Sequence, residues 1–242
     1  MSRPARVEAP GSWRRLGLLI PSSNSVMEVD FYRHLPAGVT LHTARMYMED
    51  TTPEGEGIML DHFALPAARD VGTVRPDAVV FGCTSAGALR GNDYDRELCE
   101  RIAEAAGCPA VSVIASVRAA IGRRGGHRIG VVTPYVNSLN EKIKESIEAG
   151  GDVEVAGIFG LGITENFAIA EVSPDEVVGF AVSSLEPLSI DLAFASCTNL
   201  RAMEVVPELE RALGVPVVTS NAAAFEASVE LMRGSGRVSG AV

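Results

Sequence analysis

The chain has 242 residues, 47% of them hydrophobic, which is enough to bury a core in one large domain or two small ones. Its formal net charge of -10 argues against nucleic acid or an anionic membrane as a partner, because the field of the protein repels polyanions. No run approaches the roughly 20 apolar residues that a membrane span needs, so we expect a cytoplasmic protein.

The first half of the chain alternates short apolar runs with stretches of helical period. The expected order is a strand at LGLLI (16–20), a helix, a strand at TLHTARM (40–46), a lid-like loop over 47–57 and another helix. A buried strand that ends at Cys83, a helix over 95–106 and a last strand after a proline follow. The pattern does not decide whether the lid-like loop moves.

The second half repeats this order. Strands at IGVV (129–132) and EVAGIF (154–159) flank a helix over 139–149, and a buried strand then ends at Cys197. A helix over 203–213 and a last strand after a proline complete this half. Strands that alternate with helices predict parallel βαβ units, because a parallel pair needs a long crossover connection.

The two halves also match residue by residue. RRLGLLIPSSN (14–24) aligns with HRIGVVTPYVN (127–137), and the segments that carry Cys83 and Cys197 align at nearly the same offset. We therefore predict an α/β protein with two pseudo-symmetric doubly wound lobes, each with a four-stranded parallel sheet. The active site is expected in the cleft between the lobes, because ligands bind at the carboxyl ends of parallel strands.

The lobes are predicted to span 12–112 and 113–221. The helix over 222–234 is expected to pack on the first lobe, and the helix over 116–122 to cross in the opposite direction. Such an exchange would bind the halves together without a flexible linker. The expected assembly is a homodimer, the commonest form of soluble oligomer.

Both lobes carry a cysteine at the end of the third strand. Cys83 in GCTS and Cys197 in SCTN each open a turn into a helix, where free amides and the helix dipole lower the pKa of a thiol. We predict that these two are catalytic, although each could be a small buried side chain. Cys99 and Cys108 are predicted to be structural. The four cysteines form no CxxC pair and have no histidine at metal-ligand spacing, so no metal site is expected.

Polar residues near the same strand ends could bind a small carboxylate. Asn24 could instead cap a helix, Tyr135 could be a partly buried residue at a lobe boundary, and Asn166 could be a plain turn residue. The sequence contains no P-loop, GxGxxG or GxSxG motif, and no cofactor is expected. The predicted substrate-binding residues are Ser22, Asn24, Thr84, Ser85, Tyr135, Asn166, Thr198 and Asn199.

These residues together resemble the aspartate/glutamate racemase superfamily, whose members have two lobes and one catalytic cysteine in each. Over about residues 15–232, the chain is most similar to the branch that contains maleate cis–trans isomerases and arylmalonate decarboxylases. The isomerases keep functional residues at the positions of Asn24 in PSSN, Cys83, Tyr135 in TPY, Asn166 and Cys197.

The resemblance implies a cofactor-free isomerisation of a small cis-dicarboxylate. Cys83 would add to one alkene carbon as a thiolate, Cys197 would protonate the neighbouring carbon, and rotation followed by elimination would give the trans isomer. The two asparagines and Tyr135 would hold the carboxylates.

Two stretches depart from the isomerase pattern. The polar residues Thr84 and Ser85 look closer to racemases and to related proteins of ectoine breakdown, and LGITENFAIAEV is similar to the decarboxylase branch. An amino-acid (aspartate or glutamate) or hydantoin racemase, an arylmalonate-type decarboxylase, an ectoine-breakdown protein and a non-catalytic two-lobed binding protein therefore stay alternatives. A racemase would use the two cysteines as one-proton bases on opposite faces of a Cα, with no adduct. The similar decarboxylases keep only the second cysteine, so Cys83 argues against that activity.

Overall fold

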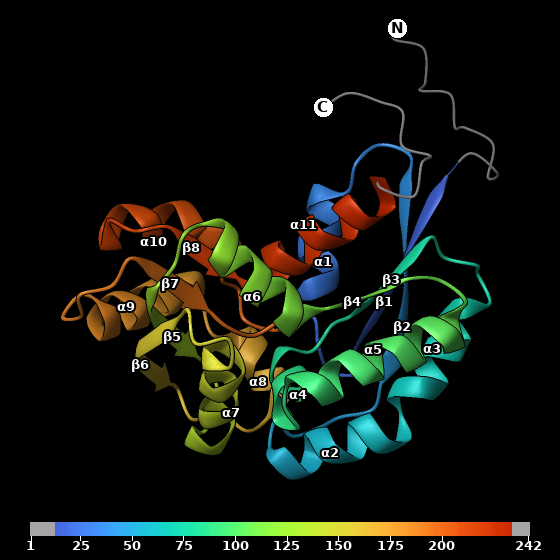
Figure 1. Cartoon of the computed structure of the whole chain (residues 1–242), viewed down its shortest axis with the longest axis horizontal. Helices are drawn as coiled ribbons and strands as arrows, with labels where there is room; N and C mark the ends of the chain where they lie inside the picture. The colour runs from blue at the N-terminus through green and yellow to red at the C-terminus, as the bar shows by residue number, and fades with distance from the viewer. Residues whose placement is uncertain (1–12, 234–242) are drawn as a thin grey trace, which may run out of the picture.

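The computed structural model describes residues 13–233, which form two lobes side by side (Figure 1). Each lobe is built on one parallel sheet with helices around it. The lobe boundary expected at residue 12 and the helix end expected at residue 234 lie outside the described residues.

The first lobe takes up the first half of the described chain. Its strands are β1 (Arg14–Pro21), β2 (Val39–Met46), β3 (Ala78–Phe81) and β4 (Ala110–Ser112). Its helices are α1 (Met27–His34), α2 (Pro53–His62), α3 (Ala64–Gly72), α4 (Thr84–Leu89) and α5 (Asn92–Ala106), and α6 (Val113–Arg123) follows the last strand.

The second lobe has the same order of elements. Its strands are β5 (Arg128–Thr133), β6 (Glu154–Gly160), β7 (Leu192–Ala195) and β8 (Val217–Thr219). Its helices are α7 (Asn137–Glu148), α8 (Asn166–Glu171), α9 (Pro174–Leu185), the 3-10 turn η2 (Met203–Val205), α10 (Val206–Leu213) and α11 (Ser220–Met232).

The two sheets have matching topology, β2-β1-β3-β4 and β6-β5-β7-β8, and all neighbouring strands are parallel. Strands β3 and β7 are apolar and fully buried, as expected for a parallel strand with helices on both faces of its sheet. They lie beside β1 and β5, with Leu18 opposite Val80 and Val131 opposite Phe194. The predicted fold class is confirmed.

Local sequence moves some element ends from their expected places. Residues 53–57 of the expected loop belong to α2, because the Thr52 side chain accepts the amide of Gly55 and Pro53 fits the first position of a helix. The connection after β2 is therefore the short segment 47–52. The expected helix over 203–213 is divided into η2 and α10, whose first turn contains Pro207.

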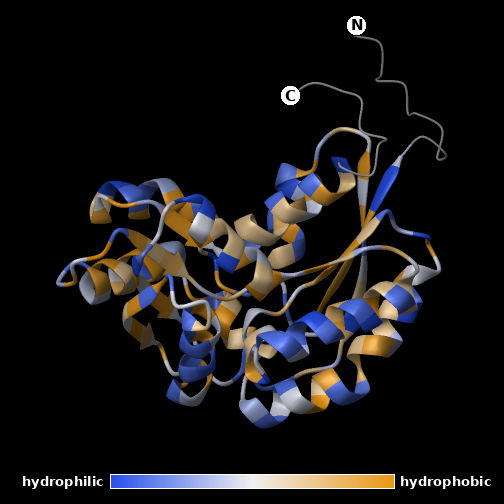
Figure 2. Cartoon of the chain, viewed as in Figure 1, coloured by the Kyte–Doolittle hydropathy of each residue, from blue (hydrophilic) through white to orange (hydrophobic). Residues whose placement is uncertain are grey.

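One hydrophobic core extends through both lobes and includes residues of β1, β3, β5 and β7. A second cluster lies on the other face of the first sheet and includes Leu19, Met59 of α2, Ala68 of α3 and Ile102 of α5. The sheets are hydrophobic while the visible face of α5 is largely hydrophilic (Figure 2). No helix within residues 13–233 is long and apolar enough to cross a membrane.

The helix that follows the last strand of each lobe reaches the other lobe (Figure 1). Helix α11 packs on α1 and β3, and Phe225 meets Phe31 edge to face with ring centroids 5.2 Å apart. Helix α6 contacts β8 and α11, and Arg124 at its end donates to the carbonyl of Val217 at 2.9 Å. Because these contacts cross between the sheets, the two lobes share one core.

Phe31→Ala tests how much this contact contributes. We expect the free energy of unfolding to fall by about 3–5 kcal/mol, because a fully buried aromatic ring is removed and a cavity is left beside Phe225. Tyr32→Ala, on the same helix and 59% exposed, is the control and should change the free energy by less than about 0.5 kcal/mol. Urea unfolding measures both, and equal losses would contradict the role of the contact.

Candidate active site

The two predicted catalytic cysteines lie at equivalent strand ends. Cys83 comes two residues after β3 and directly before α4, whereas Cys197 comes two residues after β7 and opens a turn. Both are buried, with 4% and 5% of their surface exposed. A Cβ on Gly82 would lie 2.7 Å from the carbonyl oxygen of Leu19, so glycine is needed for the chain to enter the first turn so close to β1.

The threonines after the cysteines connect the two lobes. The hydroxyl of Thr198 donates to the carbonyl of Gly82 at 3.1 Å. In the other direction, the hydroxyl of Thr84 donates to Ser220 Oγ at 2.9 Å, and Ser220 Oγ accepts the amide of Cys197 at 3.0 Å. These bonds are buried, so the loss of one partner would leave a polar atom unsatisfied. They fix the two cysteine turns relative to each other.

The backbone of Cys197 is strained. Its φ is 117°, a region that residues other than glycine rarely adopt and that costs on the order of 1–3 kcal/mol. The bond to Ser220 holds its amide, and the amide of Asn199 donates to its Sγ at 3.3 Å. Strain that surrounding contacts maintain is typical of functional sites.

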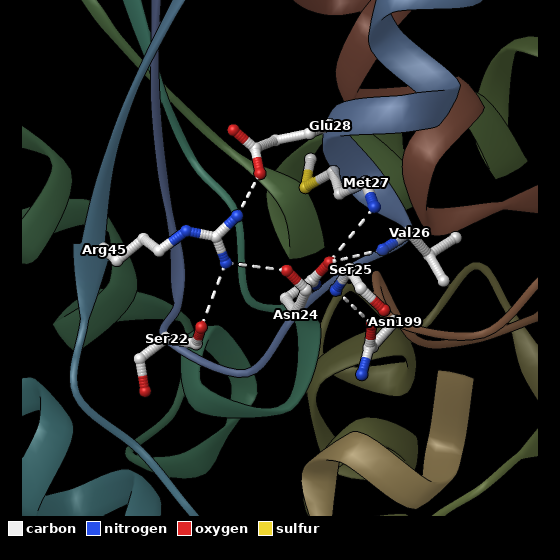
Figure 3. A network of polar contacts seen from close by, with 8 residues as sticks. All are labelled: Ser22, Asn24, Ser25, Val26, Met27, Glu28, Arg45 and Asn199. Carbon is white, nitrogen blue, oxygen red and sulfur yellow. Dashed lines mark hydrogen bonds and ion pairs between the residues drawn. The ribbon is translucent and has the colours of Figure 1, made fainter. Parts of the chain in front are cut away.

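The side chain of Asn24 makes three hydrogen bonds. Its Oδ1 accepts the amides of Val26 and Met27 at 3.1 and 3.0 Å, at the start of α1, and its Nδ2 donates to Thr198 Oγ1 at 3.0 Å (Figure 3 shows the amide contacts). The helix-capping alternative is therefore correct for the oxygen of Asn24. The nitrogen bridges the two lobes.

Arg45 of β2 holds the turn that contains Asn24. Its guanidinium donates to the carbonyls of Ser22 and Asn24 at 3.0 and 2.8 Å and forms an ion pair with Glu28 (Figure 3). The hydroxyl of Ser22 accepts the amide of Met48 at 3.1 Å, so Ser22 lies at the edge of the site next to segment 47–52. The guanidinium of Arg45 therefore stabilises the turn that contains Asn24.

Two more asparagines extend the network. Asn199 Oδ1 accepts the amide of Ser25 at 2.9 Å, and its Nδ2 donates to the carbonyl of Asn166 at 2.6 Å. Asn166 is the first residue of α8 rather than a turn residue. Its Nδ2 donates to Ser23 Oγ at 2.7 Å, and its Oδ1 accepts the hydroxyl of Thr51 at 3.1 Å.

Segment 47–52 of the first lobe pairs with the second lobe. The amide of Thr51 donates to the carbonyl of Thr164 at 2.6 Å, and the amide of Asn166 donates to the carbonyl of Glu49 at 3.0 Å. These backbone bonds, together with the burial of the cysteines, describe a closed site. We expect that a substrate enters when this pairing opens.

Tyr135 and Ser85 lie beside the thiols. The phenol of Tyr135 is buried, and the Cys197 thiol and Ser85 both influence its pKa. Ser85 also interacts with the thiol of Cys83. Burial and the nearby thiols raise the pKa of Tyr135 well above its ordinary value, so the phenol stays neutral.

Glu56 of α2 is a buried acid that sequence analysis does not identify. The Ser85 hydroxyl donates a hydrogen bond to its Oε1, and its buried Oε2 has no partner among the described residues. Burial raises the pKa of the Glu56 carboxyl to about 8, against the lowering effect of Ser85. In PEGEG at a helix start, an acid indicates an exposed first-turn residue, so the pattern gives no signal of burial.

The prediction that the two thiols have lowered pKa values is wrong. Burial raises the pKa of Cys83 well above its ordinary value and that of Cys197 to about 11, and Glu56 adds to both shifts. The expected backbone amide donors are present, but desolvation outweighs them. The helix contribution is also small, because α4 has six residues and no helix begins directly after Cys197.

The network thus connects most of the predicted site residues. Hydrogen bonds link those outside the thiol environment into one chain across the lobes, while Ser85 and Tyr135 lie next to the thiols. Sequence reasoning missed Glu56, Ser220 and Ser23, because a serine or an acid at a helix end has many ordinary uses. Within the described residues, no group of three or more His, Cys, Asp or Glu could hold a metal ion.

A surface groove of about 1070 Å³ lies between α5, α6 and α7. It is lined by residues such as Asp95, Arg118 and Glu145 and contains neither Cys83 nor Cys197. It is therefore separate from the buried site between the lobes.

Comparisons with known proteins identify the family to which the chain is similar. A family model described as arylmalonate decarboxylase matches residues 16–242. The arylmalonate decarboxylase of Bordetella bronchiseptica is 27% identical over 223 residues, 92% of each chain. The maleate isomerase of Nocardia farcinica is 28% identical over 217 residues, 86% of this chain and 85% of that protein.

Solved structures show the same fold. A cysteine-to-alanine form of the maleate isomerase Iso from Pseudomonas putida S16 with maleate has a TM-score of 0.84 at 24% identity, over 91% of this chain and 92% of that one. A cysteine-to-serine mutant of the Nocardia farcinica maleate cis–trans isomerase with a covalently bound succinylcysteine intermediate has a TM-score of 0.80 at 20% identity, over 91% and 93%.

We expect the resting protein to resist alkylation at Cys197. Because burial raises the pKa of this thiol from 9.0 to about 11, its thiolate fraction at neutral pH should be about 100-fold below that of an ordinary cysteine. Brief iodoacetamide treatment at pH 7.5 followed by mass mapping measures the rate, with the urea-unfolded chain as control. Equal rates in the folded and unfolded chains would contradict the raised pKa.

Proposed function

Because the chain belongs to the arylmalonate decarboxylase family, we propose that it is a cofactor-independent isomerase of a small dicarboxylate, of the maleate cis–trans type, with Cys83 and Cys197 as its catalytic pair. The observation that carries the proposal is the pair itself: two buried thiols at equivalent strand ends, with Cys197 close enough to raise the pKa of Cys83. The similarity to curated maleate isomerases supports the choice of reaction.

The reaction needs one nucleophile and one acid. Cys83 is a neutral thiol at rest, so it first gives its proton to water while the site is open to substrate. The resulting thiolate forms a bond to one alkene carbon, the π electrons pair with the proton of the Cys197 thiol at the other carbon, and a succinyl thioether results. Rotation about the new single bond brings the carboxylates to opposite sides. Cys197 then takes the proton back, and the bond from carbon to Cys83 breaks to release the trans isomer.

The surroundings of Cys197 suit a residue that gives and regains a proton. Tyr135 and the amides of Asn199 and Leu200 all lower the pKa of this thiol, so they stabilise the thiolate left after protonation of the substrate. The strained backbone of Cys197 keeps its sulfur among these donors. The donors are in place before the charge forms, which is how preorganised sites stabilise a transition state.

Cys83 supports isomerase over decarboxylase activity, because the decarboxylases similar to this chain keep only the second cysteine. A racemase of an amino acid would also need both cysteines but would form no adduct. The presence or absence of an adduct therefore distinguishes the racemase from the isomerase by experiment. We also propose that the protein forms a homodimer, that its only ligand is the small carboxylate substrate, and that it is located in the cytoplasm.

Alanine variants of the two cysteines test the assignment of roles. Cys197→Ala should bind maleate and slowly accumulate a thioether on Cys83, because water can supply the proton in place of Cys197 but no paired base is left to take it back. Cys83→Ala should form no adduct, and both variants should lose at least about 100-fold in kcat/KM, a typical loss for an acid–base or nucleophilic group. Intact-mass measurement and proton NMR of maleate and fumarate follow the two outcomes.

The racemase alternative gives the opposite pattern. In deuterated water an inverted aspartate or glutamate would carry solvent deuterium at Cα, and no adduct would form with maleate. That result, with no turnover of maleate, would overturn the isomerase proposal. An unchanged rate in either alanine variant would overturn the role of that cysteine.

Chelation tests the cofactor-free part of the proposal. We expect EDTA treatment and dialysis to leave the turnover of maleate unchanged, because the two thiols supply the covalent and proton-transfer steps. The assay measures the rate before and after treatment. Activity that disappears with the chelator and returns with one divalent metal would contradict it.

A further inference from the structure

The carboxyl group of Glu56 is only partly satisfied by hydrogen bonds and lies near the two thiols. The residue is 0% exposed, Oε1 accepts the Ser85 hydroxyl, and Oε2 is buried without a partner among the described residues. The Coulombic influence of Glu56 reaches both Cys83 and Cys197. Its carboxyl therefore belongs to the proposed site, although the mechanism above does not use it.

No described cation is buried in this site to balance a carboxylate. The buried polar side chains of residues 13–233 include no lysine, arginine or histidine. An isolated buried carboxylate is costly, so the acid takes a proton, in agreement with the pKa of about 8 for Glu56. At neutral pH the carboxyl is mainly a neutral acid with one O–H to donate.

We propose that Glu56, as a neutral acid, binds one carboxylate of the dicarboxylate substrate by donating a hydrogen bond from Oε2, and so selects a doubly charged substrate in a site without buried cations. The inference rests on the proposed function. It assigns Glu56 as a substrate-binding residue that acts with the neutral donors at the strand ends.

The effect of Glu56 on the two thiols favours a neutral Glu56 that donates to a carboxylate. It disfavours an ionised Glu56 that binds an ammonium group. An ionised Glu56 raises the pKa of both thiols, which opposes formation of the Cys83 thiolate. A neutral Glu56 removes that repulsion and also tolerates an incoming carboxylate. The same protonation state thus serves both the nucleophile and the substrate.

The elements around Glu56 bring few other groups that titrate. Helices α3 and α4 pack against α2, and Arg69 and Asp70 of α3 are exposed. Arg90 at the end of α4 donates to both carboxylate oxygens of Asp61, at 2.6 and 2.7 Å. The remaining facing groups are Cys83, Cys197 and Tyr135, whose raised pKa values keep them neutral when Glu56 ionises.

Glu56 lies next to the segment whose pairing with the second lobe closes the site. It lies in the first turns of α2, directly after segment 47–52, and the backbone bonds of Thr51 and Glu49 attach that segment to the second lobe. When the segment pairs as described, the carboxyl is held next to Ser85 of α4. Closure and carboxylate recognition would therefore occur together.

The test measures maleate binding as a function of pH in a variant that cannot form the adduct. In Cys83→Ser, calorimetry from pH 7.0 to 9.5 should give a constant affinity up to about pH 8 and then a fall approaching tenfold per pH unit, because binding requires the proton on Glu56. Cys83→Ser with Glu56→Gln keeps a donor that does not titrate, and its affinity should stay level over this range.

Two further variants separate the role of Glu56 from general structural effects. Glu54→Gln, an exposed acid two residues away, should keep the wild-type pH profile. Ser85→Ala removes the hydrogen bond that lowers the pKa of Glu56, so the fall in affinity should begin at a higher pH. Thermal melting of each variant confirms that it is folded.

The outcomes are distinct. The same alkaline fall in the Glu56→Gln protein, an affinity that rises through pH 8, or a loss of more than 100-fold in binding at pH 7.0 in folded Glu56→Gln would overturn this inference and leave the proposed function in place. Absence of maleate binding by both proteins at every pH would overturn the proposed function together with the inference.

Discussion

The reciprocal hydrogen bonds between the two Cys-Thr turns determine how the site is arranged. Thr198 reaches the carbonyl of Gly82, and Thr84 reaches the amide of Cys197 through Ser220. Each lobe therefore positions the cysteine turn of the other, and neither turn would keep its geometry alone. The exchange of α6 and α11 between the lobes supports the same arrangement with apolar contacts, because the lobes cannot separate without exposing a common core.

Burial explains the electrostatics of the site. The thiols, the phenol and the carboxyl are all neutral at rest, since they are buried and the buried residues described supply no cation. A dicarboxylate would then be the strongest charge in the site, held by hydroxyl, amide and acid donors. In such an environment a hydrogen bond to an ion is stronger than in water, which allows neutral groups to hold an anion.

The internal repeat made the fold accessible from sequence. Apolar runs of strand length recur in the same order in both halves, and they became β1, β3, β5 and β7 because parallel strands covered on both faces need such runs. Cys83 and Cys197 could be singled out because both end equivalent strands. The ends of the short helices could not be predicted from the sequence. Thr52 and Pro53 begin a helix inside what appeared as a loop, and Pro207 lies where an apparently continuous helix is divided in two.

The sequence by itself determined the fold class, the two-lobed repeat and the pair of cysteines, because periodicity and repetition are properties of the chain alone. Tertiary structure decided the ionisation of that pair, since a pKa depends on how many water molecules and donors surround a group, and burial outweighed the amides at Cys83. It also decided the partners of Asn24 and Asn166, which lie in the opposite lobe. Glu56 became part of the site only through the packing of α2 on α4, because no local pattern distinguishes a buried acid from an exposed one.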